Sequence, residues 1–342
     1  MAPTLKDVAA LAGVSIKTVS NVVNGYGFVK AENRRRVEEA LKATGYRPNV
    51  GARNLRRGRT GCIAMIVPEL GVPYFGELVS LVITAAADRD WNVLIEQTQG
   101  VREREREALS ALGPHIVDGA ILSPEALTAD DLTAGDPGVP FVILGEHWLP
   151  ASADRVAIDN VAAARAAVSH LAGLGRRRIA AIGTNPARGT AALRLRGYRE
   201  ALAEAGLEYR EELVVPAAKY HRRDGAQAMA ELLDLPQPPD AVFCFNDLLA
   251  MGALRTAADR GLWVPDDVAV AGFDNIEEAA YAHPRLTTVA PDKQAIAETA
   301  VELLSKRTGG GDGPEPRDVV APFRLEVRGS TRPRGPISGP RP

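Results

Sequence analysis

From residue 61 onward the sequence alternates short apolar runs with longer amphipathic ones, and this alternation restricts the fold more than any other feature of the chain. Runs such as CIAMIV, NVLIEQT and AVFCF have the length and composition of β-strands. The segments between them place apolar residues at helical spacing, as in PYFGELVSLVITAAADRD. Such alternation is typical of a parallel, doubly wound α/β sheet. About nine strand–helix units exceed one sheet of ordinary size, so we predict two lobes.

Polar and aromatic side chains follow several of the predicted strands, at the points where the strands end. Ligands of doubly wound sheets bind beyond the carboxyl ends of the strands, so these side chains are candidates for one cleft. They are Tyr74, Phe75, Glu146, Arg194, Asn246, Asp247 and Asp274. Aromatic rings can stack on the apolar face of a sugar, and carboxylate, amide and guanidinium groups can pair with its hydroxyl groups. A purine could use the same rings, and single residues also have structural interpretations, such as Asp247 capping the next helix or Tyr74 joining the core.

The first 25 residues have a different pattern, with two short apolar-periodic runs around the turn AGVS. Thr4 and Asp7 have the spacing of a capping box, which predicts a helix that begins at residue 5. Gly13 can adopt the left-handed conformation that ends a helix, and Ser15 can cap a second helix from residue 16 to about residue 24. Two short helices joined by a tight turn are typical of a helix-turn-helix unit.

The second helix of this unit would present a polar outer face. That face carries Ile16, Lys17, Thr18, Ser20 and Asn21. A helix that enters the major groove by its N-terminal residues reads base edges with side chains of these types. Lys17 can reach guanine acceptors, Asn21 can reach adenine or a phosphate, and Ile16 can contact a thymine methyl group. The alternative is an ordinary helical hairpin with a solvated outside.

Charge is distributed unevenly along the chain. Residues 1–60 contain twelve basic residues (Lys and Arg) and four acidic residues (Asp and Glu). The whole chain has 41 basic and 43 acidic residues, so the other residues include 29 basic and 39 acidic ones. A basic head on an acidic body favours a polyanionic partner for the head, with a merely solvated surface as the alternative.

A third helix is predicted from about residue 32 to residue 44, where Gly45 ends it. The segment YRPNVGARNLRRGRTG that follows is rich in arginine and carries Leu55, an apolar side chain that we expect to be exposed. A helix of about eight residues is marginal in water, so this segment would order only on DNA and beside a second copy. Leu55 would then suit a wedge between base steps in the minor groove.

The stretches TLKDVAALAGVSIKTVSNVVNG and GYRPNVGARNLRRGRTG resemble the N-terminal headpiece of the LacI/GalR family of bacterial transcription regulators. By position, the resemblance implies that operator DNA is faced by Leu5, Ser15, Ile16, Lys17, Thr18, Ser20, Asn21 and Asn24. The resemblance also implies a hinge helix that contacts DNA, formed by Tyr46, Asn49, Ala52 and Leu55. Lys30 departs from the family pattern and weakens the cap of the third helix.

The body is similar to the family's effector domain, which has the periplasmic-binding-protein fold, through RRRIAAIG, RLRGYREAL, FCFNDLLAMGAL and VPDDVAVAGFDN. The resemblance implies an effector site formed by Tyr74, Phe75, Glu146, Arg194, Tyr220, Asn246 and Asp274. Lys293 departs from the family pattern because sugar-responsive members can have an aromatic residue there. Glu146 departs because some members have an aspartate one residue earlier.

The implied organisation is a helix-turn-helix headpiece at residues 1–47, a hinge at 48–60, an effector-binding and dimerisation domain at 61–330 and a disordered tail at 331–342. The chain would cross between the two lobes near residues 158–162, 288–292 and 320–324. The tail is rich in proline and glycine and has no heptads, so we expect a dimer and not a tetramer joined through its tails.

Several function classes lack a motif in this sequence. There is no Walker motif, G-x-S-x-G element or zinc pattern, and the histidines show no metal-ligand spacing, so we predict no catalytic residue, metal or cofactor. No apolar run reaches about 18 residues and no signal peptide is apparent, which indicates a cytoplasmic protein without a membrane partner. Cys62 and Cys244 lie in apolar runs and are expected to be buried free thiols.

We therefore predict a repressor of transcription that binds a palindromic operator as a homodimer and is controlled allosterically by a small-molecule effector, a sugar or sugar derivative. A purine-responsive regulator of the same fold is the main alternative. A solute-binding protein for transport would suit the body but not the head, and a sugar-metabolising enzyme would have to turn its ligand over. Induction and co-repression both fit this design.

Overall fold

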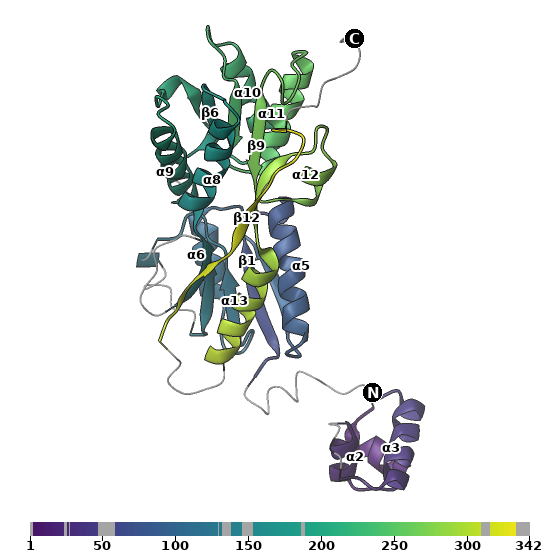
Figure 1. Ribbon diagram of the computed structural model, residues 1–342. Helices are drawn as coiled ribbons and strands as arrows, with labels where there is room; N and C mark the ends of the chain where they lie inside the picture. The colour runs from purple at the N-terminus through teal and green to yellow at the C-terminus, as the bar shows by residue number, and fades with distance from the viewer. Residues whose placement is uncertain are drawn as a thin grey trace. The chain divides into compact units, whose positions relative to one another are not determined.

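The computed structural model describes residues 3–23, 26, 28–46, 59–128, 130–131, 138–145, 153–185, 189–308 and 315–332 (Figure 1). The chain divides into two compact units, Met1–Thr60 and Gly61–Pro342. We call the smaller unit the headpiece and the larger unit the body.

The headpiece contains three described helices around a small apolar core. They are α1 (Leu5–Ala12), α2 (Ile16–Val23) and α3 (Ala31–Thr44). The core consists of Val8, Ala9, Ala12, Val19, Val22, Val37 and Ala40. These residues recur at helical spacing, in agreement with the apolar periodicity of the sequence. Lys30 supplies no side-chain hydrogen bond to the start of α3, as predicted.

The first two helices begin at the predicted caps, and α1 also ends at its predicted cap. Thr4 and Asp7 form a capping box, in which the Thr4 N–H donates to the Asp7 carboxylate at 2.8 Å. Gly13 follows the last residue of α1 with a φ of 62°. At the start of α2 the Thr18 N–H donates to the Ser15 hydroxyl oxygen at 3.1 Å. Local chemistry alone therefore defines this helix-turn-helix unit.

The described residues of the body form two six-stranded sheets, and each sheet is the centre of one lobe. In lobe 1 the order is β11-β5-β4-β3-β1-β2 and paired strands are parallel. Its strands are β1 (Cys62–Val67), β2 (Asn92–Gln97), β3 (Gly119–Leu122), β4 (Phe141–Leu144), β5 (Asp154–Ile158) and β11 (Asp318–Ala321). In lobe 2 the order is β12-β10-β9-β8-β6-β7, and β12 is antiparallel to β10. Its strands are β6 (Ile179–Thr184), β7 (Val214–Pro216), β8 (Ala241–Cys244), β9 (Ala269–Phe273), β10 (Thr287–Pro291) and β12 (Phe323–Glu326).

Helices flank both sheets, as a doubly wound fold requires (Figure 1). Lobe 1 carries α5 (Pro73–Ala87), α6 (Arg102–Ala111) and α13 (Lys293–Arg307). Lobe 2 carries α8 (Asn160–Gly173), α9 (Gly189–Glu204), α10 (Arg222–Leu233), α11 (Asp247–Asp259), α12 (Glu277–Tyr281) and a 3-10 turn, Glu211–Leu213. Within the lobes α5 packs against α13, α8 against α9, and α10 against α11. The predicted α/β class and two-lobed architecture are confirmed.

Three connections join the lobes within the described chain. The chain leaves lobe 1 between β5 and α8, returns between β10 and α13, and crosses again between β11 and β12. The strand patterns in the sequence did not predict β5, β10, β11 or β12. Each of these strands adjoins a crossing, and β11 and β12 pair with strands far from them in the sequence. Their partners are therefore set by the assembled lobes and not by local pattern.

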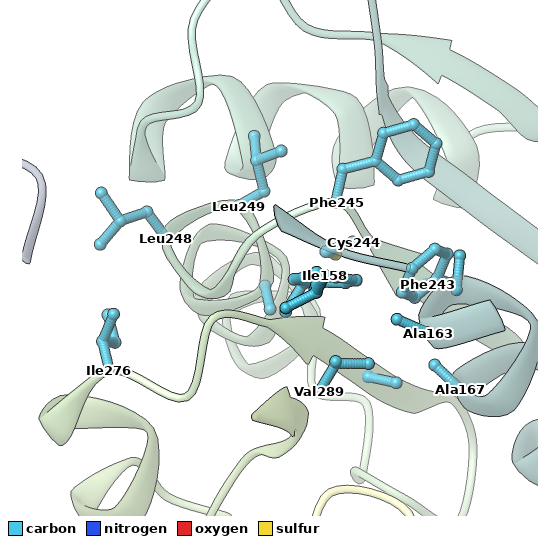
Figure 2. Close-up of a cluster of buried hydrophobic side chains, with 14 of the residues drawn as sticks. Ile158, Ala163, Ala167, Phe243, Cys244, Phe245, Leu248, Leu249, Ile276 and Val289 are labelled. Atoms are coloured by element: carbon cyan, nitrogen blue, oxygen red, sulfur yellow. The ribbon is translucent and has the colours of Figure 1, made fainter. Parts of the chain in front are cut away.

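The core of lobe 2 is centred on β8 and the residue that follows it. Phe243 and Phe245 alternate with Cys244 along the chain, and all three side chains are fully buried. Figure 2 shows them in one cluster that includes Ala163 and Ala167 of α8. The small side chains of α8 let this helix lie close to the sheet, which brings the start of α8 to the boundary between the lobes.

The two cysteines lie in different lobes. Cys244 is buried with a free thiol, as predicted, and burial raises its pKa above the usual range. Cys62 was expected to be buried but is only half-buried, and this partial burial also raises the pKa of its thiol. Neither thiol forms a disulfide within the described part of the chain.

The boundary of the predicted tail is wrong at its first residue. Thr331 is buried, and its hydroxyl oxygen lies 2.7 Å from the Thr287 hydroxyl and 2.8 Å from Nε2 of His170. The preceding Ser330 is buried as well and donates to the Val270 carbonyl oxygen at 2.6 Å. These contacts tie the end of the described chain to the sheet of lobe 2.

The close packing of α10 against α11 generates a stability prediction. A Cβ added at Gly252 would overlap the carbonyl oxygen of Arg222 and stand 2.6 Å from the amide nitrogen of Ala226. We expect Gly252→Ala to lower the free energy of unfolding by about 1–3 kcal/mol, because overpacking forces the two helices apart. Denaturant titration of the purified protein measures this change.

Gly173, at the end of α8, is the matched control because a Cβ there would meet no atom within 4 Å. Gly173→Ala should leave the free energy of unfolding unchanged or raise it slightly. Equal effects of the two substitutions would contradict the packing argument.

Candidate ligand cleft and nucleic-acid interface

A cavity of about 160 Å³ lies between lobe 1 and lobe 2, at the carboxyl ends of their strands. Six of the seven predicted effector residues line it: Tyr74, Phe75, Arg194, Tyr220, Asn246 and Asp274. The seventh, Glu146, lies outside the described residues. Strand ends of both sheets meet at this cavity, which is the placement expected for a ligand site in a doubly wound fold.

Arg194, on α9, is buried at the lobe 2 side of the cavity with 8% of its surface exposed. Its Nε donates to Asn160 Oδ1 at 2.7 Å, and its Nη1 donates to the carbonyl oxygen of Phe245. The guanidinium carbon stands 3.5 Å from the centre of the Phe273 ring. These contacts fix the plane of the guanidinium, so its remaining terminal nitrogen has a defined position.

That remaining nitrogen, Nη2, stands 3.9 Å from Oδ1 of Asp274. At this distance the two groups form an ion pair but no hydrogen bond, so neither fixes the orientation of the other. Asp274 is buried, with 8% of its surface exposed. Burial raises the pKa of Asp274 to about 6, and the charges of Arg194 and Lys293 oppose this rise.

The backbone around Asp274 has an uncommon conformation. Asp274 has a φ of 106° and Asn275 a φ of 47°, so two consecutive residues other than glycine occupy the left-handed region. This conformation turns the chain sharply after β9, and both residues need support from neighbours to hold it.

Asn246 and Tyr220 form a second polar group at the cavity. The Asn246 side chain caps α11 by accepting the Leu249 N–H at 2.9 Å, and its Nδ2 donates to the Tyr220 carbonyl oxygen at 3.1 Å. The Tyr220 hydroxyl donates to the carbonyl oxygen of Gly183 at 2.6 Å. Both side chains are therefore held in place by the fold of lobe 2 and also line the cavity.

Asp247 does not cap α11, because Asn246 performs that role. Its carboxylate is fully buried and accepts the Thr288 hydroxyl at 2.6 Å and the Ile276 N–H at 2.9 Å. Burial and, next, the nearby charge of Asp274 raise the pKa of Asp247 well above its usual value. Asp247 thus ties α11, β10 and the loop after Asp274 together without lining the cavity.

The lobe 1 side of the cavity contains two aromatic rings. Tyr74 and Phe75 form an edge-to-face pair with ring centres 5.3 Å apart, and both rings pack partly against the core. Tyr74 therefore packs against the core, as its structural interpretation predicts, and it also lines the cavity. Gln99 and Ser123 add polar groups to the same wall.

Glu105 of α6 is buried in lobe 1 although its sequence context is typical of a solvated helix face. It lies in the alternating charge run REREREA, yet only 1% of its surface is exposed. Its carboxylate accepts the backbone N–H groups of Glu125, Ala126 and Leu127 at 2.8, 3.0 and 2.9 Å. These bonds hold the loop whose residues 123–125 line the cavity. An alternating charge run contains no signal that separates this buried glutamate from its exposed neighbours.

Other residues of the cleft were missed for an identifiable reason. Asn160 follows β5, which the sequence did not predict, so a complete strand assignment would have found it. Gln99 follows the predicted strand β2, so the strand-end criterion already applied to it. Glu69 and His221 lie on opposite lobes with Oε2 and Nε2 3.0 Å apart. Such a contact across the cleft depends on how the lobes meet, and the sequence carries no spacing that predicts it.

In the headpiece, α2 presents the predicted outer face. Ile16 is 49% exposed and Lys17 is exposed, whereas Thr18, Ser20 and Asn21 are half-buried. The N-terminal turn of α2 is therefore its most accessible part. Of the other predicted DNA contacts, Asn24, Asn49, Ala52 and Leu55 lie outside the described residues.

Two predicted DNA-facing residues have a structural role in the headpiece. Leu5 and Tyr46 are half-buried and pack against the core of the three helices. Tyr46 follows Gly45, which ends α3 with a φ of 64°, so it extends the headpiece core beyond the last helix. Tyr46 was expected to belong to a hinge helix, but in the structure it lies outside any helix and packs against the headpiece core.

Other site types find no support in the described ranges. No group of three or more His, Cys, Asp and Glu side chains there is arranged to hold a metal ion. None of the helices in those ranges combines the length and the apolar character that crossing a bilayer requires.

Family models match both units of the chain. The model for bacterial regulatory proteins of the lacI family matches residues 4–49, and the model for a periplasmic binding protein-like domain matches residues 168–331. The first match covers α1, α2 and α3, and the second covers most of lobe 2.

Whole-chain comparisons agree with these matches. The HTH-type transcriptional repressor CytR of Escherichia coli (strain K12) is 34% identical over 335 residues, which cover 97% of each chain. The solved complex of the transcriptional regulator CelR with cellobiose is 36% identical with a TM-score of 0.71, and the match covers 96% of this chain and 99% of that chain. The Lac repressor dimer bound to operator and the anti-inducer ONPF is 26% identical with a TM-score of 0.83, covering 97% and 99%. This chain therefore belongs to the LacI family of bacterial regulatory proteins, and it is a DNA-binding transcriptional regulator and not an enzyme.

Proposed function

We propose that this protein is a repressor that binds a palindromic operator as a homodimer and releases or tightens that binding when a sugar enters the cleft between its lobes. The observation that carries the proposal is the buried pair of Arg194 and Asp274 on the cavity wall, 3.9 Å apart. It offers a fixed donor and a fixed acceptor, side by side, to a ligand with neighbouring hydroxyl groups.

The chemistry of the cavity suits a polyhydroxylated ligand. An ionised Asp274 can accept hydrogen bonds from two hydroxyl groups, and Arg194 Nη2 can donate to a ring or hydroxyl oxygen. The Tyr74 and Phe75 rings provide an apolar surface opposite these charges, which matches the apolar face of a sugar ring. The cellobiose in the CelR complex is consistent with this ligand class.

A purine is the second candidate effector, and the aromatic pair of Tyr74 and Phe75 is the observation that favours it. A purine base would stack on these rings, whereas a free sugar depends more on the hydroxyl contacts of Arg194 and Asp274. A screen of sugars, sugar phosphates and purines by thermal shift separates the two classes, because a bound ligand raises the unfolding temperature.

The headpiece supplies the DNA-binding surface. The exposed N-terminal turn of α2, with Ile16 and Lys17, can enter the major groove and read base edges. The excess of basic residues in positions 1–60 supplies salt-sensitive contacts to phosphates. Binding to operator DNA would take place in the cytoplasm, where a bacterial chromosome is found.

An exposed strand edge supports the homodimer. β2 is one of the two edge strands of the lobe 1 sheet, and five of its six residues are exposed. Leu94 and Ile95 on this strand are 45% and 41% exposed. An apolar edge strand of this kind is a pairing site that a monomer normally protects, so a second copy is its expected cover. Two headpieces on a two-fold axis would then fit two half-sites of a palindrome.

The hinge remains a prediction that extends this proposal. Asn49, Ala52 and Leu55 lie outside the described residues, and we propose that they order on the operator with Leu55 in the minor groove. The distance between lobe 1 of one protomer and lobe 1 of its partner would then determine whether the two hinge segments can meet on DNA.

The effector proposal is tested with Arg194→Ala. Loss of the fixed guanidinium should abolish the effect of the ligand on operator affinity, while operator affinity without ligand stays within about threefold of wild type. Fluorescence anisotropy with labelled operator, with and without each ligand of the screen, measures both quantities.

Arg196→Ala is the control for this variant, because Arg196 lies on the same helix with its side chain 62% exposed in an ion pair with Glu200. It should keep the full ligand response. An undiminished response in Arg194→Ala would remove Arg194 from the effector site.

The role of α2 is tested with Lys17→Ala. A lost contact to a base edge should reduce the preference for operator over random DNA about tenfold, with the thermal stability of the protein unchanged. Lys42→Ala, on the exposed surface of α3, removes the same charge and should reduce affinity for both DNAs equally. An equal loss of preference in both variants would show that Lys17 contributes charge alone.

Ligand affinity should also depend on pH through Asp274. Because the pKa of Asp274 is raised to about 6 in the folded protein, protonation below that pH removes an acceptor. We expect ligand affinity to rise as pH increases through 6 and to level off above it. Calorimetric titration between pH 5 and 8 checks this dependence, and Asp274→Asn should bind weakly without that rise. Wild-type affinity that is constant over this range would exclude an ionised Asp274 from ligand binding.

A further inference from the structure

We propose that Lys293 is the positioning residue of the effector site: it holds the Asp274 backbone in its binding conformation and, through Glu77, connects that backbone to lobe 1. This inference rests on the proposed function of the cleft and assigns a role to a residue that does not line the cavity.

The first step is the need for support at Asp274. Asp274 and Asn275 both have left-handed φ angles, 106° and 47°, which side chains other than glycine adopt only when neighbours over-determine them. The direction of the Asp274 carboxylate depends on this backbone conformation. Whatever stabilises the two peptide units therefore sets the geometry of the ligand's acceptor.

Lys293 supplies that support through its ammonium group. Its Nζ donates to the Asp274 carbonyl oxygen at 3.0 Å and to the Asn275 carbonyl oxygen at 2.9 Å. It also donates to the Glu77 carboxylate. An ammonium has three protons, so these three acceptors use all of them. The Lys293 side chain is 12% exposed, and an uncharged chain of equal length could not replace these bonds.

The position of Lys293 makes it a link between lobes. It is the first residue of α13, directly after the crossing from β10 to lobe 1, and α13 packs against α5. Glu77 belongs to α5, and its Oε1 accepts the Glu277 N–H at the start of α12 at 3.0 Å. The Lys293–Glu77 pair thus belongs to lobe 1 and contacts residues 274, 275 and 277 of lobe 2.

The remaining anchors of the same loop come from lobe 2 itself. The Ile276 N–H donates to Asp247, and Arg328 Nη2 donates to Asn275 Oδ1 at 2.7 Å. Both contacts lie within lobe 2, so a movement of lobe 1 relative to lobe 2 would not change them. The Lys293–Glu77 pair differs because a change of the angle between the lobes would change its distance to the loop.

The pair also adjoins the aromatic wall of the cavity. Lys293 Nζ stands 5.9 Å from the centre of the Tyr74 ring. Tyr74 and Glu77 both belong to α5. A ligand between Tyr74 and Asp274 would therefore contact two groups that adjoin the Lys293 ammonium. Ligand binding and lobe orientation are coupled through this pair, and the coupling is reciprocal.

Two variants separate positioning from lobe coupling. Lys293→Met removes the bonds to both carbonyl oxygens and to Glu77, so it should weaken ligand affinity about tenfold and reduce the ligand's effect on operator affinity to near none. Glu77→Gln keeps an acceptor for the Glu277 N–H and leaves Lys293 on the carbonyl oxygens. It should keep ligand affinity within about threefold of wild type while the effect on operator affinity falls about fivefold.

Lys306→Met is the matched control, because Lys306 pairs with Glu302 on the exposed face of the same helix, α13. It should retain wild-type ligand affinity and coupling. Calorimetry without DNA gives ligand affinity, and operator binding with and without ligand gives the coupling factor. The probes are cellobiose, D-ribose and adenosine, and all variants are studied as the full chain.

Amide hydrogen exchange without any ligand supplies a readout that does not depend on the effector. In Lys293→Met the N–H groups of residues 276 and 277 should exchange at least about tenfold faster than in wild type, and in Lys306→Met they should not. If wild type binds none of the probes, the proposed function fails for these ligand classes, and exchange alone judges the pair. Unchanged exchange in Lys293→Met, or wild-type coupling in that variant, would overturn the role assigned to Lys293.

Discussion

The body of this regulator is organised around a buried arginine and a buried aspartate that stand 3.9 Å apart at the boundary of its lobes. Burial removes hydration from both ions, so each must be compensated by fixed partners. For Arg194 these are the Asn160 side chain, the Phe245 carbonyl oxygen and the Phe273 ring. For Asp274 they act on its backbone, which is held in a left-handed conformation. The ends of α8, β8 and β9 must therefore meet within a few ångströms, and this requirement places the cleft.

The three connections between the lobes explain how a ligand in that cleft can act at a distance. They allow the lobes to change their angle while they remain attached, and residues beside two of them, β5–α8 and β10–α13, line the cavity. Polar contacts span the lobes: Glu69 with His221, Glu77 with the Glu277 N–H, and Lys293 with the carbonyl oxygens of Asp274 and Asn275. Polar contacts of this kind have definite geometry and break over short displacements, so they suit a junction with two discrete arrangements.

Much of the candidate site could be predicted because strand ends in a doubly wound sheet are marked locally. Tyr74, Phe75, Arg194, Asn246 and Asp274 line the cavity as strand-end position and family resemblance implied. The headpiece was equally predictable, since Thr4, Gly13 and Ser15 act within a few residues of themselves. Glu105 and the Lys293–Glu77 pair were not predictable, because a charged residue on a helix looks the same in sequence whether it meets water or a backbone amide. The burial of Thr331 was missed for a similar reason, since a polar residue in a Pro- and Gly-rich stretch carries no sign of its buried hydroxyl partners.

By itself the sequence determined the class of fold, the helix-turn-helix unit and the side of each sheet on which a ligand would bind. These features follow from spacing, capping chemistry and chain direction, which act over short distances along the chain. Only the tertiary structure decided which strands complete each sheet at the crossings, which carboxylate is buried, and which lysine supports Asp274. Those outcomes depend on contacts such as the one between Lys293 and Glu77, 216 residues apart, and long-range contacts exist only after both lobes have assembled.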